Sequence, residues 1–350
     1  MPIVIKPIGN INNPTDGFDP EVPYQMIPFR QTREMAVQTG DSKAEMSLTV
    51  PDVSSMSNFR ILRQSVPNLF PLPGPGIFVS RIALPERSIV QFTLSGRASG
   101  RTILEGRDRP GSDTPLLKPD FALEVSVKRP EIRRFAVCYV FDQINRDKGQ
   151  RIGFGTLFEE ISKIYEKQAN CSTINIDGHL SSTDLAKSLT LPGTSGKTFN
   201  MLDRKLLGRV VGACEAQFPG LFAQVHAVLF PVTVPLQVLT VRPLGMQLTL
   251  HRSTDGTKFQ TVFVGPSQNR DQNALRHTLA HEIGHSFGLG HNPAQSPPCP
   301  SKKKSPDPDL LPVSMHNLMF PTTLVQSSRI NRNQIENIHS FIPPFRDLEI

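Results

Sequence analysis

One short stretch of the sequence, HEIGHSFGLGH from residue 281, combines three potential metal ligands with one potential proton acceptor. On a helix, His281 and His285 lie four residues apart, so both imidazoles project from one face and can reach one ion. Gly288 can adopt the left-handed conformation that ends a helix, and the turn would bring His291 to the same ion. Glu282 is close enough to hold a coordinated water without being a ligand. Three neutral imidazoles leave a fourth position open, which is typical of a catalytic zinc site.

The spacing H-E-x-x-H-x-x-G-x-x-H resembles the signature of the metzincin clan of zinc metalloproteases, and every fixed position matches. A second segment of the resemblance lies downstream, where Asn317-Leu318-Met319-Phe320-Pro321 looks like a Met-turn. The resemblance implies that Met319 forms an apolar floor beneath the imidazoles, with Met315 as a rival candidate. The alternative interpretation is an amphipathic helix with ordinary histidines and a methionine that fills a gap.

Two positions depart from the patterns of the best-known subfamilies. Astacin-like and serralysin-like metzincins carry a tyrosine two places after the turn methionine, whereas this chain has Pro321. Asn292, directly after the third histidine, matches none of the commonest subfamily markers. The chain therefore resembles a matrixin-like or reprolysin-like metzincin, without a firm subfamily.

The resemblance implies one catalytic Zn²⁺ ion held by His281, His285 and His291. Zinc lowers the pKa of a bound water from roughly 16 towards ~7, which supplies a nucleophile near neutral pH. Glu282 would accept the proton of this water and later pass it to the leaving amine. We therefore expect a zinc metalloendopeptidase. A structural Ca²⁺ ion is a further option that no motif supports.

The residues before the first histidine predict the helix that positions it. Leu275, Leu279 and Ile283 recur at the four-residue spacing of a buried stripe. His277 lies four residues before His281 and could compete for the metal. A histidine one turn away is more typical of an orienting or surface group, so we do not assign it as a ligand.

Other segments predict the rest of an α+β catalytic domain. Strands are expected at residues 135–141, 172–177, 225–234 and 257–264. Helices are expected at residues 154–170 and 330–342. This order resembles a metzincin catalytic domain over residues 130–350, with a twisted mixed sheet, an active-site helix and a C-terminal helix. A strand within residues 237–250 is expected at the cleft edge, where a protein or peptide substrate would bind extended by strand addition.

The N-terminal part of the chain has a different character. Residues 1–43 are rich in Pro, Asn, Asp and Gln without a sustained period, which predicts an irregular arm. Residues 44–129 contain several short strand-like segments broken by Pro and Gly. They predict a small all-β sandwich domain that faintly resembles immunoglobulin-like modules. Its role would be that of a spacer or folding partner, or of docking to a target or a delivery apparatus.

Length and charge restrict the classes of partner. At 350 residues the chain can bury a core in each of two domains. The formal charge of +7 allows attraction to anionic surfaces. No basic helix with interleaved aromatics supports nucleic-acid binding, and no run of about 18 apolar residues predicts a membrane span.

The cysteines leave two alternatives open, namely two disulfide bridges or four free thiols. The four are Cys138, Cys171, Cys214 and Cys299. None precedes residue 138, so the resemblance to matrixins does not extend to an N-terminal cysteine switch. An aspartate of the arm, such as Asp16 or Asp19, could block the zinc instead.

The first ten residues lack a basic segment followed by an apolar core, so no Sec signal peptide is expected in them. A protease active in the cytosol of its producer would be harmful. We therefore expect secretion, or delivery to a target cell by a signal-independent route with the N-terminal module as the address. The alternative is a secreted or injected toxin-type binding protein, in which the N-terminal β module carries the main role and proteolysis is narrow or absent. Glu282 favours the enzyme, because a purely structural metal site needs no base.

Overall fold

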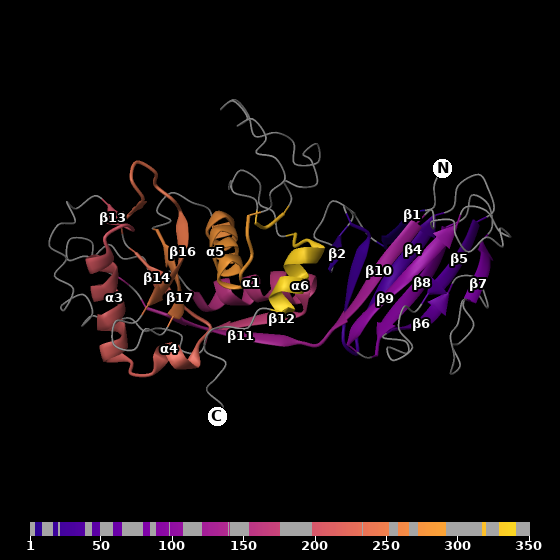
Figure 1. The fold of residues 1–350 in the computed structure, drawn as a ribbon, viewed down its shortest axis with the longest axis horizontal. Helices are drawn as coiled ribbons and strands as arrows, with labels where there is room; N and C mark the ends of the chain where they lie inside the picture. The colour runs from indigo at the N-terminus through magenta and orange to yellow at the C-terminus, as the bar shows by residue number, and fades with distance from the viewer. Residues whose placement is uncertain are drawn as a thin grey trace. The chain divides into compact units, whose positions relative to one another are not determined.

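The chain forms two compact units in the computed structural model (Figure 1). Unit 1 comprises Met1–Glu131, Glu166–Asn170 and Arg329–His339. Unit 2 comprises Ile132–Tyr165, Cys171–Ser328 and Ser340–Ile350. The structure describes residues 4–8, 17–19, 22–38, 44–49, 59–64, 80–84, 89–97, 99–107, 121–138, 140, 154–175, 198–232, 234–251, 258–265, 272–291, 317–319 and 329–340.

Among the described residues, unit 1 contains two β-sheets. The four-stranded sheet has the order β1 (Val4–Pro7), β4 (Thr32–Gln38), β8 (Ile89–Gly96) and β6 (Phe59–Gln64). The six-stranded sheet has the order β2 (Phe18–Asp19), β3 (Tyr24–Pro28), β10 (Phe121–Lys128), β9 (Gly100–Arg107), β5 (Ala44–Thr49) and β7 (Ser80–Leu84). Neighbouring strands run antiparallel, except that β3 and β10 are parallel.

The two sheets of unit 1 approach each other closely at a glycine. On β10, Leu123, Val125 and Val127 point to one face and are buried. A Cβ added to Gly96 on β8 would lie 2.9 Å from Val127 Cγ1 and 3.2 Å from Ile27 Cγ2. Glycine is thus required at this position of β8, because the opposite sheet occupies the space of a side chain.

Strands β1 to β4 fall within residues 1–43, so the structure differs from the irregular arm that the sequence predicts there. Buried and exposed residues do not alternate along β3 and β4. Strand β3 is buried at every position, and β4 buries three consecutive residues in its second half. Their partners lie far away in the sequence, because β3 pairs with β10 and β4 with β8. The domain limits at residues 43 and 129, and the immunoglobulin-like character, stay predictions.

Unit 1 also includes most of helix α6 (Arg332–Ser340). The Glu336 carboxylate accepts hydrogen bonds from the Tyr24 hydroxyl at 2.9 Å and from Lys128 Nζ at 2.6 Å. Arg101 donates to the same carboxylate at 2.6 Å. One carboxylate on α6 therefore joins side chains of β3, β9 and β10.

A second ionic contact within unit 1 involves Asp19 on β2. Its side chain accepts from the Arg329 guanidinium at 3.0 Å and from the backbone N–H of Arg332 at 2.8 Å. Asp19 and Arg329 are both buried. Asp19 is thus engaged within unit 1 and is not the zinc-blocking group considered above, while Asp16 lies outside the described residues.

Unit 2 is built on a five-stranded mixed sheet. Its order is β12 (Cys171–Asn175), β11 (Glu131–Val137), β14 (Ala227–Pro231), β17 (Lys258–Val264) and β16 (Gly245–His251). Strands β11, β14 and β17 are parallel, and β16 runs antiparallel to β17 at the edge. A two-stranded parallel sheet pairs β13 (Phe199–Asn200) with β15 (Leu236–Gln237).

Helices α1 (Phe154–Ala169), α3 (Arg204–Gln217), α4 (Leu221–Gln224) and α5 (Gln272–Ser286) complete the α+β fold. The predicted helix at 154–170 corresponds to α1, and the apolar runs correspond to β11 and β14. Helix α5 contacts β16 and β17 and lies beside the edge strand in Figure 1. Within the described ranges, no helix has the length and apolarity that a membrane crossing requires.

The described cysteines settle one alternative. Cys138, Cys171 and Cys214 are buried, and none of the three forms a disulfide. Two bridges among four cysteines would need at least one bond within this group of three, so the two-bridge alternative is wrong. Cys299 lies outside the described residues.

Candidate metal centre

Helix α5 carries the first two histidines of the motif and is anchored by its apolar stripe. Leu275, Leu279 and Ile283 are all buried, as their spacing predicts. His281 and His285 are half-buried on another face of the helix. The same periodicity that buries the stripe therefore leaves both imidazoles accessible to an ion.

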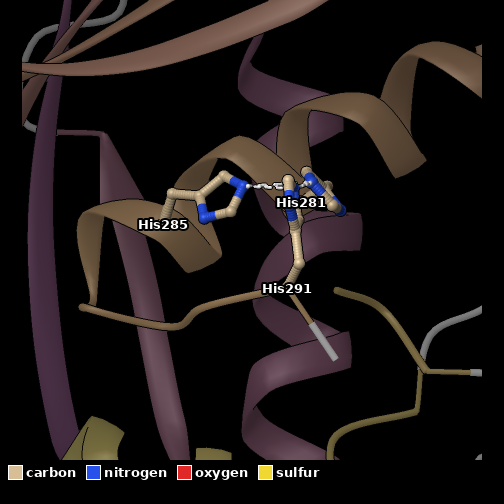
Figure 2. A group of neighbouring side chains, drawn as sticks. All are labelled: His281, His285 and His291. Atoms are coloured by element: carbon tan, nitrogen blue, oxygen red, sulfur yellow. Dashed lines mark hydrogen bonds between the residues drawn. The ribbon is translucent and has the colours of Figure 1, made fainter. Parts of the chain in front are cut away.

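The turn after α5 brings the third histidine back to the first two. Gly288 has a φ of +78°, the left-handed conformation that an L side chain rarely adopts. The Leu289 N–H donates to the Gly284 carbonyl at 3.1 Å, which closes the helix end. As Figure 2 shows, His291 then approaches His281 and His285 from the segment beyond the helix.

The three histidines converge through their Nε2 atoms. The Nε2–Nε2 distances are 3.3 Å for His281 and His291, 3.1 Å for His281 and His285, and 3.1 Å for His285 and His291. Three nitrogens at a Zn–N distance of about 2.0–2.1 Å in a tetrahedral shell would stand about 3.3 Å apart. The set could therefore hold one metal ion, and it is the cluster of this kind found among the described residues.

Carbonyl groups orient two of the rings from behind. His281 Nδ1 lies 2.8 Å from the Leu318 carbonyl, and His285 Nδ1 lies 2.8 Å from the Leu289 carbonyl. A carbonyl can only accept, so each Nδ1 carries the hydrogen and each neutral ring turns an Nε2 lone pair inward. Lone pairs facing each other at this distance repel, and a shared cation removes the repulsion.

Burial keeps these imidazoles neutral. It lowers the pKa of His281 to about 4, an effect that the neighbouring histidines reinforce and the hydrogen bond to Leu318 opposes. Burial also lowers the pKa of His285. Both rings are therefore unprotonated at neutral pH, the form in which a histidine binds a metal.

Met319, the residue expected to form the Met-turn, is packed against helix α5 at Gly284. It is fully buried, and its backbone N–H donates to Asn317 Oδ1 at 2.8 Å. A Cβ added to Gly284 would lie 2.5 Å from Met319 Sδ and 3.1 Å from the Tyr165 hydroxyl. Tyr165 on α1 donates to the Ala280 carbonyl at 2.6 Å. Gly284 thus allows Met319 and Tyr165 to pack directly beneath the histidine helix.

Glu282 follows His281 directly in the sequence, and the pKa of its carboxyl is well above the usual value. Burial raises the pKa of its carboxyl to about 7, and a backbone hydrogen bond from Gln247 opposes the rise. Its side chain lies against the first residue of β16, because a Cβ added to Gly245 would come within 2.5 Å of Glu282 Cγ. A carboxylate with a pKa near 7 can accept and return a proton near neutral pH.

The other candidate residues either do not join the three converging histidines or lie outside the described residues. His277 is buried, and burial lowers its pKa to about 4, but it is not a member of the converging set. Met315, Phe320 and Pro321 lie outside the described residues. No pattern in the sequence indicates Gly245, because its importance depends on a contact with Glu282, a residue 37 positions away.

Comparisons with solved structures give only loose alignments. A C. elegans MSP family member is 8% identical, with a TM-score of 0.20, and the match covers 31% of this chain and 94% of the other. A family 123 glycoside hydrolase from Clostridium perfringens is 10% identical, with a TM-score of 0.19, and the match covers 76% of this chain and 51% of the other. Alignments with TM-scores this low support no inference about the fold or function of this chain.

The scan against family models gives the informative match, whereas no curated protein matches the chain. The matched family is described as metallo-peptidase family M12B, reprolysin-like, and it covers residues 247–343. This segment contains α5, the three histidines, Glu282 and Met319. Residues 247–343 are therefore similar to a reprolysin-like metallopeptidase domain, which supports a zinc protease of metzincin type.

Proposed function

We propose that this protein is a zinc-dependent metalloendopeptidase. The observation that carries the proposal is the convergence of three Nε2 atoms from His281, His285 and His291, inside the segment that matches a metallopeptidase family. Glu282 beside them supplies the one further group that peptide hydrolysis needs.

The donor set fits zinc. Three neutral imidazoles in a tetrahedral spacing leave one position for solvent or substrate, whereas a structural zinc site has four protein ligands. His281, His285 and His291 would hold the ion, with the Leu318 and Leu289 carbonyls fixing two of the rings. When bound, zinc lowers the pKa of coordinated water and polarises a carbonyl.

Glu282 would act as general base and then as general acid. Its pKa of about 7 means that the ionised form is available at neutral pH and that the protonated form is not far away in energy. Its carboxylate would accept a proton from the attacking water and donate it to the leaving amine. Its burial excludes bulk water that would otherwise compete for the proton.

The substrate would bind as an extended peptide along β16. This strand pairs with β17 on one side and forms the edge of the five-stranded sheet. An edge strand offers its backbone N–H and C=O groups to an added strand, as in other cases of peptide recognition. Because Gly245 at the start of β16 touches Glu282, a peptide along this strand would pass beside the base.

Secretion, or delivery to a target cell, is part of the proposal. The formal charge of +7 supports attraction of the protein to an anionic surface, and the N-terminal β-strands would provide a docking surface for a delivery apparatus. The alternative, a toxin-type binding protein with narrow or absent proteolysis, predicts no turnover of unfolded protein substrates.

The test combines metal content with turnover in the full-length protein. We expect about one zinc per chain, and cleavage of casein or of a peptide library that a chelator abolishes. Glu282→Ala should keep the zinc but lose about 10²–10⁴-fold in kcat/KM. His285→Ala should lose the metal as well. A protein without stoichiometric zinc, or a Glu282→Ala variant with wild-type turnover, would show the proposal to be wrong.

A further inference from the structure

We infer that His226 is a positioning residue of the metal centre, because its imidazole caps the C-terminal end of α5 and so fixes the turn that presents His291. This inference rests on the proposed function, since it assigns a role towards the zinc site proposed above. His226 is not a ligand and touches no reacting atom. It would act through the backbone that separates the second histidine from the third.

The backbone at the end of α5 leaves one helix carbonyl for a side chain to satisfy. The last carbonyls of a helix have no partner within it and need other donors. The Ile283 and Gly284 carbonyls accept from the backbone N–H groups of Phe287 and Leu289, and the His285 carbonyl accepts from Gly288. The remaining carbonyl, that of Ser286, lies 2.7 Å from His226 Nε2.

The tautomer and charge of His226 follow from its surroundings. The Ser286 carbonyl can only accept, so Nε2 of His226 carries the hydrogen. Burial lowers the pKa of His226 to about 4, with a further contribution from Arg133, so the ring is neutral at neutral pH. A neutral ring with its hydrogen on Nε2 is the form that can donate to Ser286.

The ring of His226 is itself held in place. Its backbone N–H donates to the Arg134 carbonyl at 2.6 Å, immediately before β14. Its ring centroid lies 5.2 Å from that of Phe287 and 5.7 Å from that of Phe135. The donor is therefore held by a backbone hydrogen bond to β11 and by contacts with two aromatic rings.

The capped carbonyl lies within the segment that sets the third ligand. Ser286 follows His285 directly, and His291 comes five residues later. The segment between them is tied at Leu289, whose carbonyl accepts from His285 Nδ1 at 2.8 Å. With Ser286 held by His226, the turn is fixed at two points, and the exposed His291 ring is carried on a rigid segment.

The chain offers a matched control for this contact. His339 Nε2 lies 2.6 Å from the carbonyl of Ala169, the last residue of α1. It makes the same kind of bond at a helix end in unit 1, and burial lowers its pKa as well. A change at His339 therefore removes an equivalent bond within unit 1, whereas the three converging histidines belong to unit 2.

The experiment compares Met and Gln at both positions in the full-length protein, because Gln can donate a hydrogen bond and Met cannot. Zinc affinity is measured by competition with a chromogenic chelator, and the ligand geometry by the visible spectrum of the Co²⁺-loaded protein. We expect His226→Met to weaken zinc binding at least tenfold and to change the cobalt spectrum. His226→Gln should stay within about threefold of wild type, and His339→Met and His339→Gln within about twofold, even where their Tm falls.

Wild-type zinc affinity and cobalt spectrum in His226→Met would overturn the inference, and so would an equal loss in His339→Met. These outcomes are distinct from failure of the proposed function, which would appear as wild-type protein that binds no zinc or binds zinc without cleaving peptides. Should His226→Met not fold, the histidine ¹⁵N–¹H spectrum of the wild type gives the decision. An Nε2–H signal of His226 that moves on zinc addition supports the inference, and an Nδ1–H tautomer or an unmoved signal contradicts it.

Discussion

Gly245 and Glu282 are packed against each other where the edge strand β16 begins. A Cβ built on Gly245 would lie 2.5 Å from Glu282 Cγ and 3.1 Å from Glu282 Cδ. Two residues further along the strand, the backbone of Gln247 is hydrogen-bonded to the same side chain. The position of the Glu282 carboxylate therefore depends on the position of the edge strand β16. The two can pack this closely only because residue 245 has no side chain.

The first prediction concerns Gly245→Ala. The added methyl group would push Glu282 or β16 out of place, because a contact this short cannot be relieved without movement. We expect kcat/KM for a peptide substrate to fall at least tenfold while the zinc content stays at one per chain. Gly212→Ala on α3 is the control, since a Cβ there meets nothing within 4 Å. Equal turnover in the two variants would contradict the packing argument.

The second prediction concerns the pH dependence of stability in the metal-free protein. The folded pKa of Glu282 is about 7, above its usual value of 4.5, so folding favours the protonated carboxyl. The stability contributed by this group is complete below pH 4.5 and is lost as the pH rises through 7. In a chelator at pH 8, Glu282→Gln should therefore be more stable than wild type, by up to about 3 kcal/mol.

Urea unfolding of both proteins between pH 5 and 8 measures this effect. The difference between the two curves isolates Glu282, because the two proteins share every other titratable group. The advantage of Glu282→Gln should be small at pH 5 and grow towards pH 8. A difference that does not change with pH would mean that the carboxyl is not perturbed.

The elements that the sequence predicts well are those whose pattern lies within one segment. The shared helix face of His281 and His285 follows from a four-residue spacing on a helix whose apolar stripe is itself visible in the sequence. Strand β14 and helix α1 follow from a long apolar run and a long periodic segment. In each case the local pattern and the tertiary environment favour the same structure, so one sequence suffices to find it.

The features that the sequence does not predict depend on contacts between distant residues. The Tyr24 hydroxyl reaches the Glu336 carboxylate across 312 positions of the chain. The imidazole of His226 reaches Ser286 across 60 positions. A histidine within the apolar segment from Val225 to Leu229 does signal a buried hydrogen bond, but it does not identify the partner. Strands β1 to β4 escape prediction for the same reason, since their partners determine them.

The third prediction concerns Gly284→Ala. The methyl group would lie 2.5 Å from Met319 Sδ and 3.1 Å from the Tyr165 hydroxyl, within a fully buried contact. Overpacking of this kind costs about 1–3 kcal/mol of stability. Alanine favours helix formation over glycine, so a propensity effect alone would raise the Tm. We expect calorimetry to show a lower Tm and chelator competition to show weaker zinc binding, whereas a higher Tm would place Met319 elsewhere.

The fourth prediction concerns Glu336→Gln in unit 1. Burial raises the pKa of this carboxyl, but the hydrogen bonds and charge of Lys128, with those from Tyr24 and Arg101, outweigh it and lower the pKa below 4.5. The stability that this group contributes is therefore present above pH 4.5 and is lost as the pH falls through the folded pKa. At pH 7 we expect Glu336→Gln to destabilise the protein by about 2 kcal/mol, because two charged donors would lose their anionic acceptor.

The control for this variant is Glu160→Gln, which removes a more exposed ion pair with Arg276 at 3.3 Å. Pairs of this kind contribute at most about 1 kcal/mol, so its effect should be much smaller. The difference between Glu336→Gln and wild type should shrink as the pH falls to 4. Equal effects of the two variants, or a difference independent of pH, would show that α6 is held by its buried Ile335 and Ile338 and not by the Glu336 carboxylate.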